Sequence, residues 1–295
     1  MKGIVVKAYN SYYYVQAEDG REVPCRLRGK FKKGRFSLLV GDHVVFKDVP
    51  EDGSGVIEEI LPRRNCLIRP PIANVDQVVL VFAATNPAPS PVLIDRFLVL
   101  CEHAGFSPLL CFNKVDDSDI EQDLQPLYDL YARQVGYRVF ALSAQSGYGL
   151  EALMACLQGR ITAFAGPSGV GKSTLLNRLY PGFSLETGGL SRKISRGRHT
   201  TRFAMLLPLE DRSGYVVDTP GFSQTEFAQI GERELEACFP ELQPYLGQCR
   251  FNGCLHMAEP DCAVKQAVAD GAIAACRYES YQQIIGQIRE AKKGY

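Results

Sequence analysis

Residues 166–173 read Gly166-Pro167-Ser168-Gly169-Val170-Gly171-Lys172-Ser173. Glycines at this spacing let backbone N–H groups approach phosphates, while Lys172 neutralises the β and γ oxygens and the Ser173 hydroxyl can ligate magnesium. The apolar run at 160–165 predicts a buried strand before the loop, and residues 173–180 predict a helix whose first turn, at Ser173 and Thr174, favours an anion. This order of elements predicts a nucleotide-binding P-loop in an α/β sheet. It does not distinguish ATP from GTP.

A second motif, Asn113-Lys114-Val115-Asp116, lies upstream of the loop. We expect its aspartate to be a buried acceptor for the N1–H and exocyclic amine of guanine, a donor pair that adenine lacks. The apolar run at 108–112 predicts a strand that ends at this motif, where open α/β sheets bind ligands. Ser143 and Ala144 follow another strand-like run and can supply a backbone contact to the guanine oxygen. Each short motif alone occurs by chance, but beside a P-loop they predict guanine nucleotide binding.

Two further segments follow the loop. Residues 215–221, Tyr-Val-Val-Asp-Thr-Pro-Gly, place Asp218 at the end of an apolar strand, where it can hold magnesium through water. The N–H of Gly221 can then meet the γ-phosphate; the alternative is an ordinary strand followed by a Pro-Gly turn. Residues 190–202 are basic and predict a mobile switch segment, in which Thr200 or Thr201 reaches magnesium when GTP is bound.

The order of these motifs, with the guanine motif before the phosphate loop, resembles a circularly permuted GTPase. The chain also resembles the bacterial ribosome small-subunit-dependent GTPase A family over essentially its whole length, through residues 197–201, residues 218–222 and a Cys/His cluster near the C-terminus. This resemblance implies an α/β fold: a circularly permuted P-loop GTPase domain with an N-terminal OB-type β-barrel and a C-terminal helical zinc-binding domain. It also implies GTP hydrolysis during late assembly of the small (30S) ribosomal subunit, with slow intrinsic turnover that the subunit stimulates.

The C-terminal cluster supplies three thiolates and one imidazole, which can complete a tetrahedral zinc shell. Its members are Cys249, Cys254, His256 and Cys262. Disulfides and unrelated buried thiols are the alternatives on spacing alone. The six cysteines before this cluster, and Cys276 after it, are expected in the core, and Cys238 and Cys276 stay as reserve ligands.

Residues 1–70 predict the N-terminal domain. Short alternating stretches at 3–7, 12–17, 22–28, 41–47 and 55–61 predict five strands, and an OB-type barrel is the best fit. A basic run without an acid, interleaved with two phenylalanines, predicts an RNA contact strip; the alternative is a solvated charged hairpin. Its basic residues are Arg26, Arg28, Lys30, Lys32, Lys33 and Arg35.

Residues 62–71 predict a proline-containing connector into a GTPase domain at 71–226. A buried strand at 77–84 then alternates with helical stretches, which predicts a parallel α/β sheet. These helices are expected at 90–104, 120–135 and 149–157.

Residues 227–295 predict the helical zinc-binding domain, with helices at 232–239, 263–270 and 277–292. The last helix carries apolar residues at helical spacing, which predicts a packing face, with a partner site as the alternative. These residues are Tyr278, Tyr281, Ile284, Ile285 and Ile288.

For the chemistry, the resemblance implies in-line attack of water on the γ-phosphate, with Lys172 and magnesium stabilising the developing charge. Phe222 stands where many GTPases place a water-orienting glutamine, and an apolar ring cannot orient water by hydrogen bonding. The resemblance favours His199 in the switch segment as the group that orients the water. Together with Lys172, we expect His199 and Thr200 to be catalytic. His199 could instead contact RNA or solvent. An incomplete site predicts slow hydrolysis until the small subunit orders the switch.

Composition indicates the class of protein. The 295 residues allow two or three domains, and the formal net charge is zero. No signal stretch and no run of about 18 apolar residues occurs, so secretion and membrane spanning are not expected. Ten cysteines without a secretion signal indicate a reducing compartment, so we expect a cytoplasmic protein. Nothing in the sequence requires more than a monomer.

Two other classes of function stay open. A scaffold for structured RNA would use its nucleotide site only as a sensor, with negligible turnover. A P-loop kinase is disfavoured because the Asn113–Asp116 motif is specific for guanine and no acceptor-substrate domain is evident. Because the zinc domain follows directly from the segment at 218–221, nucleotide state could reorient the C-terminal domain.

Overall fold

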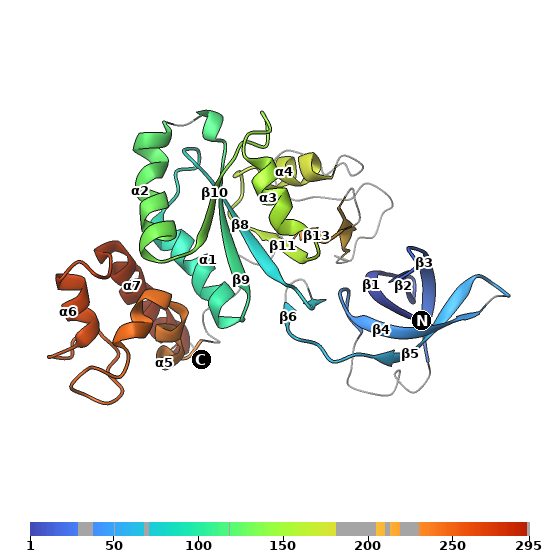
Figure 1. The fold of residues 1–295 in the computed structure, drawn as a ribbon. Helices are drawn as coiled ribbons and strands as arrows, with labels where there is room; N and C mark the ends of the chain where they lie inside the picture. The colour runs from blue at the N-terminus through green and yellow to red at the C-terminus, as the bar shows by residue number, and fades with distance from the viewer. Residues whose placement is uncertain are drawn as a thin grey trace. The chain divides into compact units, whose positions relative to one another are not determined.

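The computed structural model describes residues 1–28, 38–49, 51–67, 71–117, 119–180, 205–209, 213–218 and 230–293, which Figure 1 draws in colour. The chain divides into two compact units. The first contains Met1–Gln77, Met154–Phe164 and Leu176–Phe222, and the second contains Val78–Leu153, Ala165–Leu175 and Ser223–Tyr295. Among the described residues, no helix combines the length and the apolar character needed to cross a membrane.

Five strands near the N-terminus close into a barrel in the order β1-β2-β3-β5-β4. Neighbouring strands are antiparallel except for β3 and β5, which are parallel. This arrangement confirms the predicted five-stranded barrel of OB type. The strands are β1 (Lys2–Tyr9), β2 (Tyr12–Ala17), β3 (Glu22–Leu27), β4 (His43–Val49) and β5 (Ser54–Ile60).

The barrel interior is filled by the inward-facing residues of the alternating strands. Val5, Val15, Cys25, Val44 and Ile57 are fully buried and pack together. In β2 and β3 buried residues alternate with more exposed ones, because successive side chains of a strand point to opposite faces.

A six-stranded sheet has the order β10-β9-β8-β11-β13-β12. Strand β9 is parallel to β10, β11 is parallel to β13, and β12 is antiparallel to β13 at the edge. All seven residues of β8 are buried, and the apolar run that follows Gln77 is typical of a strand covered on both faces. The strands are β8 (Gln77–Ala83), β9 (Ser107–Asn113), β10 (Arg138–Ala141), β11 (Ile161–Ala165), β12 (Leu207–Pro208) and β13 (Tyr215–Asp218).

Helices follow the strands as predicted, with one exception. The expected helices at 90–104 and 149–157 are α1 (Pro91–His103) and α3 (Leu150–Leu157), and α4 (Lys172–Leu179) follows the P-loop. The stretch at 120–135 is not one regular helix, because wider π-helical turns flank the short α2 (Gln125–Tyr128). Pro126 lies in α2 and lacks the N–H that an ordinary helical ladder requires.

The C-terminal segment contains α5 (Glu232–Leu235), α6 (Ala263–Ala269) and α7 (Ala275–Lys293), drawn in orange and red in Figure 1. Helix α5 is shorter than predicted, and the chain continues as a 3-10 turn toward Pro240, which disfavours helical geometry in the residue before it. The packing face predicted on α7 is confirmed: Tyr281, Ile284, Ile285 and Ile288 are fully buried, and Tyr278 is half-buried.

A buried ionic network attaches α7 to α1. Arg277 is fully buried and donates from Nη1 to Asp95 Oδ1 at 2.5 Å and from Nε to Glu241 Oε1 at 2.5 Å. The Tyr131 hydroxyl donates to the same Asp95 oxygen at 2.7 Å, and the guanidinium lies 4.6 Å from the centre of the Phe239 ring. Burial raises the pKa of Asp95, and the Arg277 charge opposes that shift. No feature of the sequence indicated this network.

The connector predicted at 62–71 contains regular structure that was not expected. In its described part, β6 (Cys66–Leu67) pairs with β7 (Ile72–Ala73), which lies just after the connector, in a two-stranded antiparallel sheet. Two-residue strands lie below the length at which alternation of apolar residues becomes visible in a sequence.

Candidate functional site

Two glycines shape the loop between β11 and α4. Gly166 has φ +145° and Gly171 has φ +91°, conformations that other residues rarely adopt. A Cβ on Gly166 would lie 2.1 Å from the Val81 carbonyl oxygen, and one on Gly171 would lie 2.4 Å from Asn113 Nδ2. Glycine is therefore required at both positions for space as well as for the dihedral angle.

Asn113 joins three of the predicted motifs. It is the last residue of β9 and is buried; its Nδ2 donates to Val170 O at 2.9 Å, and its Oδ1 accepts from Ala144 N at 2.9 Å. One amide thus connects the guanine motif, the P-loop and the Ser143-Ala144 turn. Asn113 belongs to the motif predicted to bind guanine, and in the structure its side chain holds two loops together.

Lys114 makes a second connection to the P-loop. Its Nζ donates to Gly169 O at 2.7 Å and to Asn86 O at 2.8 Å. Its backbone is left-handed, with φ +66°, because the chain turns sharply where β9 ends. Asn86 belongs to no recognisable sequence motif, so its contact with Lys114 could not be predicted from the sequence.

Lys172 is the first residue of α4, one position earlier than predicted. Its Nζ donates to Gly166 O at 2.8 Å and to Pro167 O at 2.6 Å, so its charge lies at the loop. Ser173 is half-buried and Thr174 is exposed in the same first turn, where helical N–H groups favour an anion. The arrangement suits a phosphate group with a metal ion beside it.

Asp116 differs from expectation, because its side chain is exposed and not buried. A 3-10 turn, Val115–Asp117, carries it beyond the end of β9, so the protein alone does not desolvate this carboxylate. Ser143 is fully buried, and its Oγ accepts from Ser146 N at 3.0 Å, which shapes the turn at Ala144. Asn113, Lys114, Ser143 and Ala144 are brought together with the P-loop, as the sequence predicted.

The magnesium and catalytic predictions fall largely outside the described residues. Asp218 ends β13, and its Cα pairs with Phe164 on the parallel strand β11, which runs directly into the P-loop. Both strands therefore end at the same edge of the sheet. His199, Thr200, Thr201 and Gly221, and likewise Lys30, Lys32, Lys33 and Arg35, lie outside the described residues, whereas Arg26 and Arg28 are exposed on the barrel.

The Cys/His cluster is assembled in the C-terminal segment. The ligand atoms of Cys249, Cys254, His256 and Cys262 all lie within 4.8 Å of one another. Cys249 Sγ and Cys262 Sγ are 3.8 Å apart, and His256 Nδ1 lies 3.5 Å from the first sulfur and 3.3 Å from the second. Tetrahedral zinc with bonds of about 2.3 Å to sulfur and 2.0 Å to nitrogen requires about 3.8 Å between sulfurs and about 3.5 Å between sulfur and nitrogen. The donor set suits one zinc ion, and the distances among Cys249, His256 and Cys262 match this geometry.

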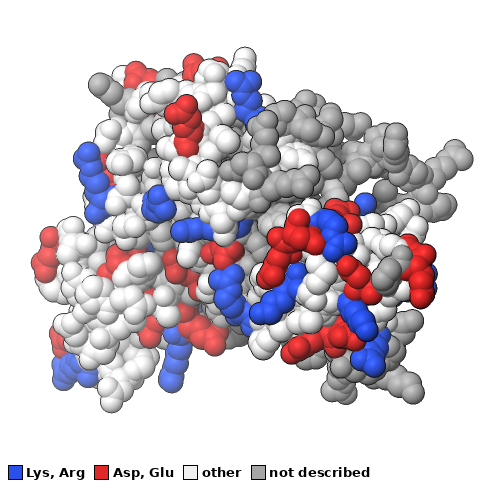
Figure 2. All heavy atoms as spheres, turned by 45° about the vertical axis from the view of Figure 1, so that its right-hand side comes forward, with Lys and Arg blue, Asp and Glu red and all other residues white. Residues whose placement is uncertain are grey.

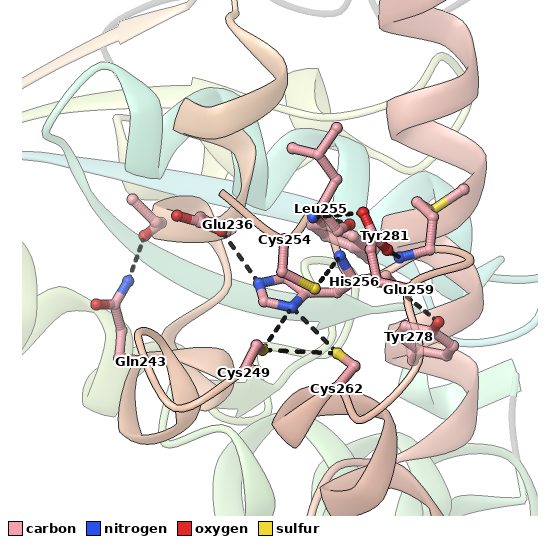
Figure 3. A network of polar contacts seen from close by, with 12 residues as sticks. Glu236, Gln243, Cys249, Cys254, Leu255, His256, Glu259, Cys262, Tyr278 and Tyr281 are labelled. Carbon is pink, nitrogen blue, oxygen red and sulfur yellow. Dashed lines mark hydrogen bonds and ion pairs between the residues drawn. The ribbon is translucent and has the colours of Figure 1, made fainter. Parts of the chain in front are cut away.

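Residues around the cluster hold its loop in place, as Figure 3 shows. Glu236 Oε2 lies 3.1 Å from His256 Nε2, on the side of the ring away from the sulfurs. Tyr278 and Tyr281 of α7 donate to the carbonyls of His256 and Leu255, at 2.6 and 3.0 Å. The sequence analysis missed Glu236, because a carboxylate thirteen residues before the first ligand belongs to no spacing pattern.

Chemistry around the cluster excludes one alternative. All ten cysteines are free thiols, so the disulfide reading is wrong. Burial raises the pKa of the Cys254 thiol to about 12, so this thiol is protonated at neutral pH unless a cation lies beside it. Cys238 and Cys276 do not join the cluster, and Cys66, which was expected in the core, is exposed.

Comparison with known proteins identifies the family. The sequence profile of the RsgA GTPase domain matches residues 60–228, and that of the RsgA N-terminal domain matches residues 2–57. The chain belongs to the RsgA GTPase family. It is therefore a GTPase, and membership of the RsgA family implies binding of GTP, GDP and Mg²⁺.

Relatives of the RsgA family match the whole chain. The small ribosomal subunit biogenesis GTPase RsgA of Moorella thermoacetica is 46% identical over 295 residues and is covered over 100% of both chains. The protein of the same name from Clostridium kluyveri is 43% identical over 99% of this chain and 100% of its own.

Two solved structures of this family share the fold. YjeQ from Thermotoga maritima has a TM-score of 0.85 at 39% identity, covering 97% of this chain and 98% of its own. YloQ, described as a circularly permuted GTPase, has a TM-score of 0.84 at 40% identity, covering 98% of this chain and 95% of its own. The predicted circular permutation is thereby confirmed.

Proposed function

We propose that this RsgA-family GTPase binds the small (30S) ribosomal subunit and acts in its late assembly, with slow intrinsic turnover that the subunit stimulates. The observation that carries the proposal is the joining of the P-loop, the guanine motif and the Ser143-Ala144 turn by Asn113, in a chain related over its full length to proteins named for small-subunit biogenesis.

The nucleotide would lie along the loops that Asn113 joins. Backbone N–H groups of residues 168–174 would hold the phosphates, Lys172 would move from the loop carbonyls to the β and γ oxygens, and Asp116 would accept from guanine. Ala144 N already donates a hydrogen bond to Asn113 Oδ1. A backbone contact from this turn to the guanine oxygen would therefore need either a bifurcated hydrogen bond from Ala144 N or a hydrogen bond from the N–H of Gln145. Gly221 would meet the γ-phosphate.

Magnesium would be held by Ser173 and, through water, by Asp218, with Thr200 or Thr201 joining in the GTP state. The ion would stabilise charge that develops on the phosphate oxygens. His199 would position the attacking water, because Phe222 cannot. An alanine at position 199 should then abolish stimulated turnover while nucleotide binding persists.

We propose one structural zinc ion on Cys249, Cys254, His256 and Cys262. The support is the agreement of the interatomic distances with a tetrahedral site and the carboxylate that lies against the far nitrogen of His256. The ion would hold the loop against α7 and take no part in hydrolysis.

The wider setting follows from the same proposal. With the small subunit as its partner, the protein would act in the cytoplasm, in contact with rRNA, and we propose that it does so as a monomer. The RNA contacts would come from the barrel domain at 1–70 and would include Arg26 and Arg28. The GTPase domain at 71–226 and the zinc-binding domain at 227–295 would follow the barrel domain in the chain.

Steady-state phosphate release from GTP and from ATP, with and without purified small subunits, tests the proposal. We expect slow, GTP-specific release that rises many-fold with the subunit and is lost in Lys172→Ala. GTP-specific phosphate release that the subunit does not stimulate would contradict the proposal of a ribosomal partner. Binding of the subunit without any turnover of GTP would instead favour the alternative function, a GTP-sensing RNA scaffold.

A further inference from the structure

The outer face of β1, β2 and β3 carries aromatic and basic side chains in two cross-strand rows. Tyr9 pairs with Tyr12, and Lys7 pairs with Tyr14, across the β1–β2 hairpin. Tyr13, between the two tyrosines of β2, instead packs against the barrel core. Strand alternation therefore places Tyr12 and Tyr14 on the outside.

Two cations lie over these rings. Lys7 Nζ is 5.0 Å from the centre of the Tyr14 ring and 5.8 Å from that of Tyr9. Arg26 Cζ is 4.8 Å from the centre of the Tyr12 ring, and this arginine also hydrogen-bonds to the Tyr12 hydroxyl. Tyr9 is 47% exposed and Arg26 is exposed. We call these five residues, Lys7, Tyr9, Tyr12, Tyr14 and Arg26, the tyrosine face.

The charge of the surrounding surface does not form a broad basic field. Figure 2 shows Lys and Arg interleaved with Asp and Glu on the face that is turned forward. Arg21 is paired with Asp19 and Asp48, and Arg28 lies 3.6 Å from Glu58. Among the described barrel residues, attraction of phosphate alone is therefore weak, and recognition must use another chemistry.

Stacking supplies that chemistry. Flat phenol rings stack on nucleobases whatever the base, and a cation over the ring can contact the adjoining phosphate. Tyr12 and Tyr14 are two positions apart on one strand, or about 6.7 Å, so two consecutive bases could each lie on their own ring. Bases inside a duplex are already stacked on one another and are not available.

We propose that the tyrosine face binds unpaired RNA by stacking bases on Tyr9, Tyr12 and Tyr14. This inference rests on the proposed ribosomal function and specifies its RNA: a splayed single strand, bulge or loop. It places the base contacts on the β1–β2 hairpin, beside Arg26, the first residue of the predicted basic run.

Binding of a fluorescein-labelled twelve-nucleotide oligouridine, followed by anisotropy, tests the proposal. We expect Tyr12→Leu/Tyr14→Leu to weaken binding by about 25-fold or more, because each of the two lost base–ring stacks contributes a factor of at least about five to the affinity. Tyr12→Phe/Tyr14→Phe should keep most of the affinity, since the rings remain. Tyr9→Leu, at the most exposed of the three positions, provides an independent variant that loses little packing.

Salt dependence separates stacking from charge. The tyrosine variants should leave the slope of log affinity against log salt unchanged, whereas Lys7→Met or Arg26→Met should each reduce it by about 0.7. Tyr128 is a matched control: it is 40% exposed under Arg133, 5.9 Å away, but lies in the α2 region. Tyr128→Leu should bind oligouridine as the wild type does.

Three results would overturn the tyrosine face: wild-type affinity in Tyr9→Leu and in the folded double leucine variant, equal binding of a twelve-base-pair duplex, or an equal loss in Tyr128→Leu. Thermal unfolding of each variant establishes that it is folded. Purified small subunits separate this inference from the proposed function. If the subunit binds the leucine variants as tightly as the wild type, the RNA-binding role of the tyrosine face is wrong and the proposed function is unaffected. If oligouridine binding depends on the tyrosines but the subunit does not bind the protein, the proposed function is wrong.

Discussion

At the scale of single residues, the Asn113 amide is the central polar contact of the nucleotide loops. Both of its polar atoms are satisfied by backbone groups of other loops, at Val170 and Ala144, and all three residues are buried. A buried backbone group that loses its partner incurs its full desolvation cost. The geometry of the P-loop thus depends on a residue more than fifty positions away.

We expect Asn113→Ala to lower the free energy of unfolding by about 1–3 kcal/mol for each of the two backbone groups left unpaired. Urea denaturation followed by circular dichroism measures this loss. Gln145→Ala, at an exposed position in the adjoining turn, is the control and should change stability by less than about 0.5 kcal/mol. Equal stability of the two variants would contradict the role of the amide.

Asp116 differs from the buried Asn113, because its side chain is exposed and we expect no contribution from it to the stability of the fold. Asp116→Asn should therefore unfold like the wild type. It should bind GDP about 10- to 100-fold more weakly, since hydrogen bonds to a charged group contribute about 1.5–3 kcal/mol. Titration with a fluorescent guanine nucleotide measures the effect; unchanged affinity would show that this carboxylate does not read guanine.

At the scale of elements, α7 connects two parts of the second unit. Arg277 contacts Asp95 of α1, while Tyr278 and Tyr281, about one turn further on, donate to the carbonyls of His256 and Leu255 in the Cys/His cluster. The apolar residues of α7 gave a detectable pattern, whereas Arg277 lies among polar and aromatic neighbours in the sequence and gave none.

Removing the Arg277 charge should be costly, since it leaves two buried carboxylates without their partner. We expect Arg277→Met to lower the free energy of unfolding by about 3–5 kcal/mol. Arg289→Met on the same helix removes a partly exposed ion pair with Glu232 and should cost no more than about 1 kcal/mol. Chemical denaturation of both variants gives the comparison, and a similar small loss in each would refute the buried network.

The proposed zinc site at the Cys/His cluster should depend on Glu236. This carboxylate lies beside His256 Nε2 and should hold the ring so that Nδ1 faces the sulfurs. We predict that Glu236→Gln lowers zinc affinity about 10- to 100-fold, measured by competition with a chromophoric chelator. Glu279→Gln, at an exposed position of α7, should leave the affinity unchanged, and a parallel loss there would point to a general effect of charge.

At the scale of the whole molecule, nucleotide state should alter association with the small subunit. The C-terminal segment with the Cys/His cluster follows residues 218–221 in the chain, and its helix α7 is bonded to α1 through Arg277. We therefore expect a difference of at least about fivefold between the affinities of the GTP-analogue and GDP forms, within the usual range of coupling between sites. Sedimentation with purified subunits measures it, and identical affinities of the GTP-like, GDP-bound and empty forms would remove the switch.

Local sequence was sufficient for the parts of this protein whose chemistry is contiguous in the chain. The P-loop, the guanine motif, the barrel strands and the four clustered ligands each lie within a short segment, so spacing and alternation reveal them. The long-range contacts could not be predicted in this way. Asn113 with Val170, Lys114 with Asn86, and Arg277 with Asp95 join residues that only folding brings together. A side chain acquires such a partner when strands and helices pack, and no periodicity along the chain encodes that meeting.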